Sequence, residues 1–170
     1  TGIIGASGEG KSTLLKMMIY FYHPDGGKIF YDNKEIKKHL KKIKKIFGLA
    51  IEEGSFYEDL TVYENLYHFG RLYGVRKKVL KKRVPGMIKF VGLDKASKVL
   101  AKNLSLGMKK RLDLACALIH KPSVLVLDEP TADLDPLLRK QFLHLIQKIN
   151  SHGTTIILTT QLMEEVEEIC

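Results

Sequence analysis

Residues 1–15 read TGIIGASGEGKSTLL, a glycine-rich turn between a short apolar run and a run of helical composition. Residues 5–12 fit the pattern G-x-x-x-x-G-K-[ST], in which glycines let successive backbone N–H groups turn inward around phosphate oxygens. The alternative is a surface loop that is merely rich in glycine and serine. Because an apolar pair precedes the loop and a helix-like segment over residues 11–21 follows it, the strand-to-helix context favours a nucleotide-binding loop.

The side chains of this loop have distinct expected roles. Lys11 would reach the β- and γ-phosphates as a point charge, and Ser12 would offer its hydroxyl to Mg²⁺. The helix that begins near Lys11 would point its positive end at the anion. The predicted nucleotide-binding residues are Gly5, Ser7, Gly8, Gly10, Lys11, Ser12 and Thr13.

The chain has 170 residues, of which 45% are hydrophobic and 28% charged, as is typical of one globular domain with a subdomain. No apolar run approaches the roughly 18 residues that cross a membrane. Cys116 and Cys170 lack metal-site spacing, so we expect both to be reduced. Because the first residue is not Met and the acidic run at the end has no stop signal, we expect a piece of a longer protein, truncated at both ends.

The formal net charge of +9 comes mostly from two clusters, KKHLKKIKK at residues 37–45 and RKKVLKKR at residues 76–83. Such clusters suit nucleic acid or anionic lipid. Apolar residues recur at helical spacing in both, as on the solvated faces of packed helices, and no nucleic-acid-reading module is recognisable. We therefore expect no nucleic-acid binding. The apolar positions are Leu40, Ile43, Phe47, Val79, Leu80 and Val84.

Apolar runs of strand length alternate with helix-length segments, which predicts an α/β fold with a parallel sheet. The expected strands are KIFY (28–31), IFGLAI (46–51), SVLVLD (123–128) and TTIILTT (154–160), and a helix is expected from about Pro136 to Asn150.

A long helical segment separates the second and third of these strands. Thr61 followed by Glu64 is a capping box, which starts a helical region running to about Ile119. Pro85 either bends or ends a helix. We predict one domain, with a core of residues 1–61 and 121–170 and an all-helical subdomain of about 62–120. The expected interruptions of the helical region are Pro85–Gly86, Gly92 and Gly107.

An acidic pair, Asp128 and Glu129, closes the apolar run VLVLDEP. Open parallel sheets place ligands at the carboxyl ends of their strands, where the phosphate loop would also lie. Asp128 is then positioned to hold Mg²⁺, and Glu129 to accept a proton from attacking water near the γ-phosphate. The alternative is a strand-end helix cap before Pro130. The phosphate loop in the same chain favours the catalytic interpretation.

Taken in order, the motifs resemble the nucleotide-binding domain of ABC transporters over essentially the whole chain. They are GASGEGKST, DLTVYENL, NLSLGMKKRLDLACALIHKPSVLVLDEPTADLDP, TTIILTT and QLMEEVEEI. The run LSLGMKKRL looks like the signature motif, written L-S-G-G-Q in many members and S-L-G-M in exporters resembling the bacitracin and lantibiotic-immunity ATPases.

The resemblance implies a P-loop NTPase core with an inserted signature subdomain, and ATP and Mg²⁺ as ligands. It implies a head-to-tail pair of such domains, in which each ATP also touches the partner's signature: Ser105, Leu106, Gly107 and Met108. Asp133 and Asp135 resemble a loop that couples the two sites. Separate transmembrane permease subunits are implied as well, which places the domain peripherally at the cytoplasmic face of the cell membrane.

Two positions depart from the family's pattern. Glu52 stands where Gln usually contacts Mg²⁺, and Gln161 stands where His usually contacts the γ-phosphate. A carboxylate still ligates Mg²⁺ but adds negative charge, and an amide donates a hydrogen bond but cannot become cationic. Each loss would slow hydrolysis about tenfold if it removed about 1.4 kcal/mol of transition-state stabilisation.

We therefore expect an ATPase that powers an exporter, with a hydrolysis-impaired nucleotide-gated clamp as the alternative. Glu52 and Gln161 favour the clamp, whereas Lys11, Asp128 and Glu129 favour the ATPase. Soluble ABC-type ATPases of DNA repair or translation typically carry long coiled-coil or zinc-bearing insertions, none of which is visible in the sequence. A P-loop kinase or GTPase would leave the signature helix without a role.

Overall fold

The structure is a computed structural model that describes residues 1–169. Its centre is a parallel sheet in the order β1 (Gly2–Ile4), β6 (Thr155–Thr160), β5 (Val124–Asp128) and β4 (Phe47–Ala50). The sheet confirms the predicted α/β class, and the strands lie within or close to the predicted runs. Leucine and valine make up β5 as far as Asp128, and isoleucine and leucine form the centre of β6, because helices cover both faces of the sheet.

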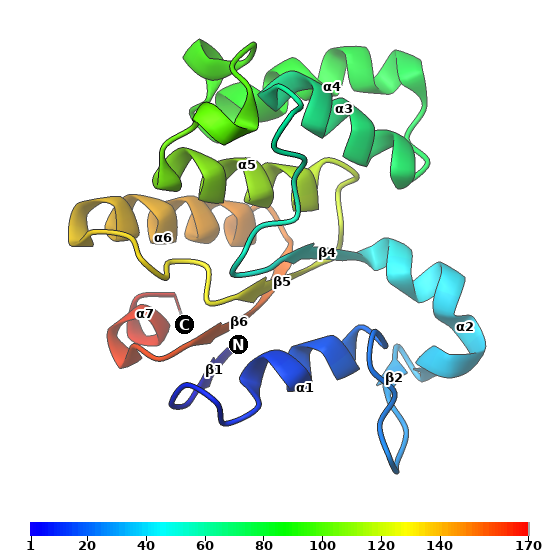
Figure 1. Cartoon of the computed structure of the whole chain (residues 1–170). Coiled ribbons are helices and arrows are strands. Elements are labelled where there is room, and N and C mark those ends of the chain that lie inside the picture. Colours follow the sequence, from blue (N-terminus) through cyan, green and yellow to red (C-terminus); the bar gives the residue numbers. More distant parts are fainter. Residues whose placement is uncertain (170) are drawn as a thin grey trace.

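Helices form layers on the two faces of the sheet (Figure 1). One face is covered by α1 (Lys11–Met18), and the other by α5 (Leu106–Leu118) and α6 (Pro136–Ser151). The short α7 (Met163–Ile169) packs beside β1 and β6 at the edge of the sheet. No helix among the described residues is long and apolar enough to cross a membrane.

A further helical layer packs on α5, away from the sheet (Figure 1). It contains α3 (Val62–Leu72), α4 (Lys77–Phe90) and the 3₁₀ turns η2 (Asp94–Ala96) and η3 (Ala101–Asn103). The predicted capping box begins α3, because the Thr61 and Glu64 side chains each accept from the other's backbone N–H, as expected.

Of the predicted breaks in the helical region, Gly92 is confirmed, because it follows the end of α4 with a φ of +73°. α4 continues through Pro85, and Gly107 lies inside α5, so neither interrupts a helix. The turn between α3 and α4 instead occurs at Gly74, whose φ of +79° suits glycine. Leu80 and Val84 are buried as predicted, but Val79 is 39% exposed.

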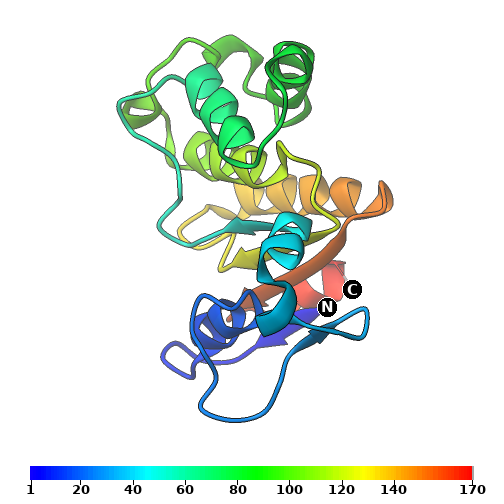
Figure 2. The same ribbon diagram turned by 90° about the vertical axis from the view of Figure 1, so that its right-hand side faces the viewer.

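The first basic cluster lies beside a small hairpin of β2 (Phe30–Tyr31) and β3 (Lys34–Glu35). It forms α2 (Ile36–Ile43) and the 3₁₀ turn η1 (Lys44–Ile46). Figure 2 shows α2 on the same side of the molecule as the beginning of α4. Phe47 belongs to β4 and not to the predicted helical stripe. Cys116 is buried in α5, and the prediction for Cys170 lies outside the described residues.

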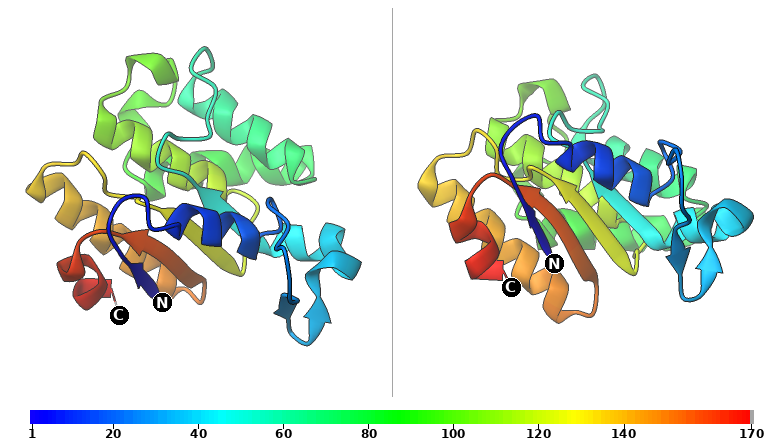
Figure 3. Two further views of the ribbon diagram at one scale, coloured as in Figure 1. Left: turned by 60° about the horizontal axis from the view of Figure 1, so that its bottom comes forward. Right: turned by 90° about the horizontal axis from the view of Figure 1, so that it is seen from below.

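The register of the sheet brings the carboxyl ends of β1, β5 and β6 together. Ile4 pairs with Thr160, and Asp128 pairs with Thr159, so β1, β5 and β6 finish at one edge. Figure 3 shows α1 lying across the strands from this edge. The phosphate loop between β1 and α1 therefore opens beside the acidic pair, as the sequence predicts.

Candidate functional site

The phosphate loop has the backbone that its glycines allow. Gly8 and Gly10 adopt left-handed conformations with φ of +84° and +90°, and nothing lies within 4 Å of where a Cβ would stand. A Cβ at Gly5 would lie 2.5 Å from Glu9 Oε2. Glu9 Oε2 also accepts a hydrogen bond from the Ala6 N–H at 2.8 Å. A loop N–H thus already binds an anionic oxygen, which is the interaction that a phosphate oxygen requires.

Lys11 sits in the centre of this loop and is 9% exposed. Its Nζ donates to the carbonyl oxygens of Gly5 and Ala6, both at 2.9 Å. The same Nζ lies 3.1 Å from Glu129 Oε1. The ammonium group is therefore held against the loop by two neutral carbonyls and one carboxylate, with which a phosphate would compete.

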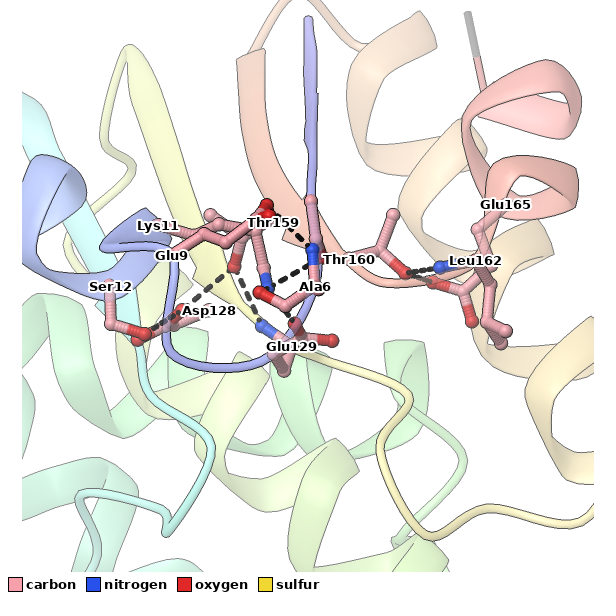
Figure 4. A network of polar contacts seen from close by, with 11 residues as sticks. Ala6, Glu9, Lys11, Ser12, Asp128, Glu129, Thr159, Thr160, Leu162 and Glu165 are labelled. Carbon is pink, nitrogen blue, oxygen red and sulfur yellow. Dashed lines mark hydrogen bonds and ion pairs between the residues drawn. The ribbon is translucent and has the colours of Figure 1, made fainter.

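A hydrogen-bonded chain joins the loop to the acidic pair (Figure 4). Ser12 Oγ donates to Asp128 Oδ1 at 2.9 Å, and Thr159 Oγ1 donates to the same oxygen at 2.7 Å. The Glu129 N–H donates to Thr159 Oγ1 at 3.0 Å. Sequence reasoning missed Thr159, which orients both acids. The available signal was the pairing of this β6 threonine with Asp128 in adjacent parallel strands.

Glu129 is buried in an unusual backbone conformation. Its φ is +44°, in the left-handed region, and the residue is 9% exposed. Its Oε1 lies within ion-pair distance of Lys11 but makes no hydrogen bond. A buried carboxylate oxygen with a free lone pair is a suitable proton acceptor, and a non-glycine residue in this region of φ is common at functional sites.

The Ser12 hydroxyl and the Asp128 carboxylate are the oxygens that fit a divalent cation. They share a hydrogen bond, so both ligands are already adjacent, and Mg²⁺ typically uses only one or two protein ligands beside substrate phosphates and water. Glu52 is exposed, and only its backbone carbonyl has a described partner, Lys110 Nζ at 2.8 Å. The structure does not bring the Glu52 carboxylate into contact with Ser12 or Asp128.

Gln161 is exposed immediately after β6. Its neighbour Thr160 donates to Glu165 Oε2 at 2.6 Å, which anchors the end of the strand on α7. Thr131, two residues after Glu129, also donates to Glu165. Gln161 thus follows a firmly held strand end at the same sheet edge as Asp128. The predicted catalytic role of Gln161 stays a prediction.

The signature residues begin α5. Ser105 caps the helix by accepting from the Met108 N–H at 3.4 Å, and both Ser105 and Leu106 are exposed. Gly107 is buried, and a Cβ there would lie 3.2 Å from Leu138 of α6. The free N-terminal N–H groups of α5 therefore face outward beside a hydroxyl, a suitable arrangement for an anion held by another molecule. The contact to a partner's nucleotide stays a prediction.

Asp113 of α5 is a buried acid that sequence reasoning missed. It is 3% exposed, and its Oδ1 accepts from the Ser55 N–H at 2.7 Å. One turn earlier, Lys110 holds the carbonyl of Glu52. Burial raises the pKa of Asp113 to about 6, although the Ser55 hydrogen bond and the Lys110 charge act in the opposite direction. These two contacts fix the loop that carries Glu52 on the helix that begins with Ser105.

Because the folded-state pKa of Asp113 is raised, protonation favours the folded protein. The stabilisation is fully present below the unfolded pKa of about 3.8 and is lost as pH rises through about 6. Asp113→Asn lacks this titration. We expect the free energy of unfolding of the wild type, relative to Asp113→Asn, to rise by up to about 3 kcal/mol between about pH 7 and about pH 4 in urea denaturation. The exposed Asp94→Asn is the control, and an identical pH dependence for both variants would contradict the assignment.

The comparisons with known proteins agree with this geometry. Residues 1–132 match the family model described as ABC transporter. The linearmycin resistance ATP-binding protein LnrL of Bacillus subtilis is 37% identical over 169 residues, which are 99% of this chain and 54% of that protein. The Nod factor export ATP-binding protein I of Ralstonia nicotianae is also 37% identical, over 99% of this chain and 53% of that protein. The chain thus spans about half the length of these curated relatives.

Two solved structures have the same fold. CbiO1 of Clostridium perfringens, described as part of the ABC transporter complex CbiONQ, superposes with a TM-score of 0.87 and 30% identity over 99% of this chain and 69% of that one. The ATP-binding subunit of an ABC transporter superposes with a TM-score of 0.84 and 27% identity over 99% of this chain and 70% of that one. The sequence match, the fold and the phosphate loop lead to one conclusion: the chain belongs to the ABC transporter family, as an ATP-binding domain with the P-loop NTPase fold.

Proposed function

We propose that the protein is the ATP-hydrolysing subunit of an ABC exporter, in which ATP binding closes a pair of these domains and hydrolysis reopens it. The observation that carries the proposal is the cluster of Lys11, Ser12, Asp128 and Glu129 at one sheet edge. The names of two relatives, for linearmycin resistance and Nod factor export, support the direction of transport.

The residues of the cluster divide the chemistry among themselves. The loop N–H groups and the Lys11 ammonium bind the phosphates of ATP and stabilise negative charge on the group that is transferred. Ser12 and Asp128 would hold Mg²⁺, which when bound neutralises phosphate charge. Glu129 orients the attacking water and accepts its proton at Oε1, the oxygen that lacks a hydrogen bond in this structure. Thr159 keeps both acids in position.

The second half of each site would come from a partner domain. Ser105 and the first N–H groups of α5 are exposed and so are free to meet the γ-phosphate on another copy or a homologous subunit. Asp133, with φ of +63°, and Asp135, which caps α6, lie in a tight connection after Glu129. This connection would suit a loop that couples the two ATP sites of a pair of domains. Separate permease subunits would hold the pair at the cytoplasmic face of the membrane, docking near α3 and the loop after β4.

The division of the domain into residues 1–61 and 121–170 with a mobile unit at 62–120 is part of this proposal. α3, α4 and α5 share one apolar cluster, and α5 also packs on the sheet, so movement of α3 and α4 relative to the sheet would pass through α5. The contacts from Lys110 and Asp113 to the loop after β4 would carry that movement to Glu52.

The second candidate is a nucleotide-gated clamp that binds ATP and turns over rarely. The positions of the two residues that differ from the family pattern favour this candidate. Glu52 has no described contact through its carboxylate, and Gln161 is exposed at the strand end and has no titratable ring. Neither then assists hydrolysis, and ATP would serve to hold the closed state.

Steady-state hydrolysis of ATP by the full-length protein and by Gln161→His separates the two candidates. If the protein is a motor, we expect turnover well above background and a change of less than roughly threefold on introducing His, because Glu129 already accepts the proton. Tight ATP binding without turnover, partly restored by Gln161→His, would establish the clamp and overturn the leading proposal. Binding is measured separately so that loss of affinity is not mistaken for loss of chemistry.

A further inference from the structure

Two basic segments that are far apart in the sequence lie on one side of the molecule. α2 with η1 and the first turns of α4 lie at the right of Figure 1, and this side faces the viewer in Figure 2. We call the basic face the surface formed by the lysines of residues 37–45, the cations of residues 77–83 and Lys121.

Two hollows on this surface have cations of the basic face in their lining. Lys44 after α2, Phe21 after α1 and Tyr73 after α3 line one hollow. Tyr73 stacks on His120, with ring centroids 3.6 Å apart. Lys121 follows directly and lines a second, open hollow with the cations of residues 78–83. Both hollows therefore carry cations of the basic face, and the stacked Tyr73–His120 pair links them.

The positive charge of this face is almost uncompensated within residues 1–169. Only Lys38 among its cations has a carboxylate within ion-pair distance, Glu35 at 3.2 Å. Two surface lysines outside this face, Lys102 and Lys109, are paired with Asp59 and Glu58. The first turn of α4 contains no acid, although cations at a helix N-terminus are unfavourable. An external anionic surface would compensate this charge.

Exposed apolar side chains lie among the cations. Phe21, which lines a hollow with Lys44, is 62% exposed, and Val79, which lines the other hollow, is 39% exposed. Aromatic side chains suit the boundary between headgroups and acyl chains, and lysines attract anionic lipids at the surface. We propose that the basic face binds the headgroup layer of an anionic lipid membrane directly. The proposal goes beyond the transporter function, since it requires neither ATP nor a permease.

Vesicle flotation of the full-length protein, without nucleotide or permease, tests this proposal. The probes are vesicles of phosphatidylcholine alone and of phosphatidylcholine with about 30 mol% phosphatidylglycerol. The test variant is Lys78→Gln/Lys81→Gln/Lys82→Gln. The control, Lys95→Gln/Lys98→Gln/Lys140→Gln, removes the same charge from exposed positions on the segment after α4 and on α6, at the left of Figure 1.

We expect binding only to the anionic vesicles, weakened about 100-fold in the test variant and changed little in the control, since each basic residue near such a surface contributes roughly fivefold in affinity. Binding should also fall steeply with added salt. Equal binding by the two variants, or no binding by the wild type, would overturn the proposal. So would preferential capture of added RNA over anionic vesicles, lost in the same variant. ATP hydrolysis by both variants, expected unchanged, distinguishes failure here from failure of the proposed function.

Discussion

The Glu129→Gln variant is expected to bind ATP and to hydrolyse it at least about 100-fold more slowly than the wild type, because a positioned general base contributes roughly 100- to 10,000-fold to rate. Gln has the shape of Glu, so Thr159 should still accept from the backbone N–H at residue 129. The amide cannot accept a proton from water, and the buried Oε1 that lacks a hydrogen bond is where the wild-type side chain would do so.

The same change should strengthen ATP binding several-fold, by an amount on the order of 1 kcal/mol. Glu129 lies 3.1 Å from Lys11 Nζ, so its carboxylate competes with phosphate for the ammonium group. Removing that charge leaves Lys11 with the two loop carbonyls alone. A large loss of hydrolysis rate together with unchanged or tighter ATP binding distinguishes a proton acceptor from a residue that merely supports the loop.

Glu9→Gln is the matched control for this experiment. Glu9 is also a carboxylate at the loop, and its Oε2 accepts from the Ala6 N–H, so the variant removes one negative charge near the phosphates. It removes no proton acceptor at the strand end, and we expect turnover within a few-fold of wild type. Single-turnover hydrolysis and equilibrium binding of ATP measure the two effects. Turnover of Glu129→Gln within about tenfold of wild type would show that the proton goes elsewhere.

The parts of the fold that the sequence predicts well are those with long, unambiguous patterns. β5 and β6 are continuous apolar runs with turn residues on both sides, and α6 has Pro136 at its first position and an aspartate cap. The phosphate loop was located from its glycines, the Lys11–Ser12 pair and the strand-to-helix context, and Gly8 and Gly10 do adopt the positive φ that glycine tolerates without strain. In each case a local signal determines a local structure.

Some helix breaks were predicted wrongly because glycine and proline occur both within helices and in the turns that end them. Gly107 lies within α5, where a Cβ would stand close to Leu138 of α6, whereas Gly74 supplies the positive φ of a turn. Composition does not separate these two cases. Pro85 is accommodated within α4. The strands β2 and β3 have two residues each, which is too short for an alternation of apolar and polar residues to be visible in the sequence.

The site was predicted in its local motifs and missed in its tertiary contacts. Lys11 and Glu129 were identified separately, but their ion pair depends on the order of the strands. In the sequence nothing distinguishes Thr159 from other strand residues, and its role follows only from the register that pairs it with Asp128. Asp113 reads as one polar residue in an apolar helix, and its hydrogen bond to Ser55 spans 58 residues. Such contacts follow from packing, for which a single sequence carries no periodic signal.

Loss of Lys11 should have the largest effect on binding. In Lys11→Met we expect ATP affinity to fall about 10- to 150-fold, since charge-assisted hydrogen bonds are worth roughly 1.5–3 kcal/mol and the Lys11 ammonium already lies against the loop carbonyls. The variant also leaves the buried Glu129 carboxylate without its cation, at 3.1 Å in the wild type. Breaking a buried pair in this way is destabilising by about 3–5 kcal/mol when desolvation is complete, so the single variant is expected to unfold more easily.

A second variant separates the two effects. In Lys11→Met/Glu129→Gln no buried charge is left alone, so we expect stability in urea denaturation to return to within about 1 kcal/mol of wild type while ATP binding stays lost. Lys16→Met, on the next turn of α1, is the control for removing a cation from this helix and should bind ATP normally. Restored stability without restored binding would assign Lys11 to the phosphates. Recovery of ATP binding in the double variant would mean that Lys11 serves only to neutralise Glu129, and the phosphate-binding role would then have to rest on the backbone N–H groups.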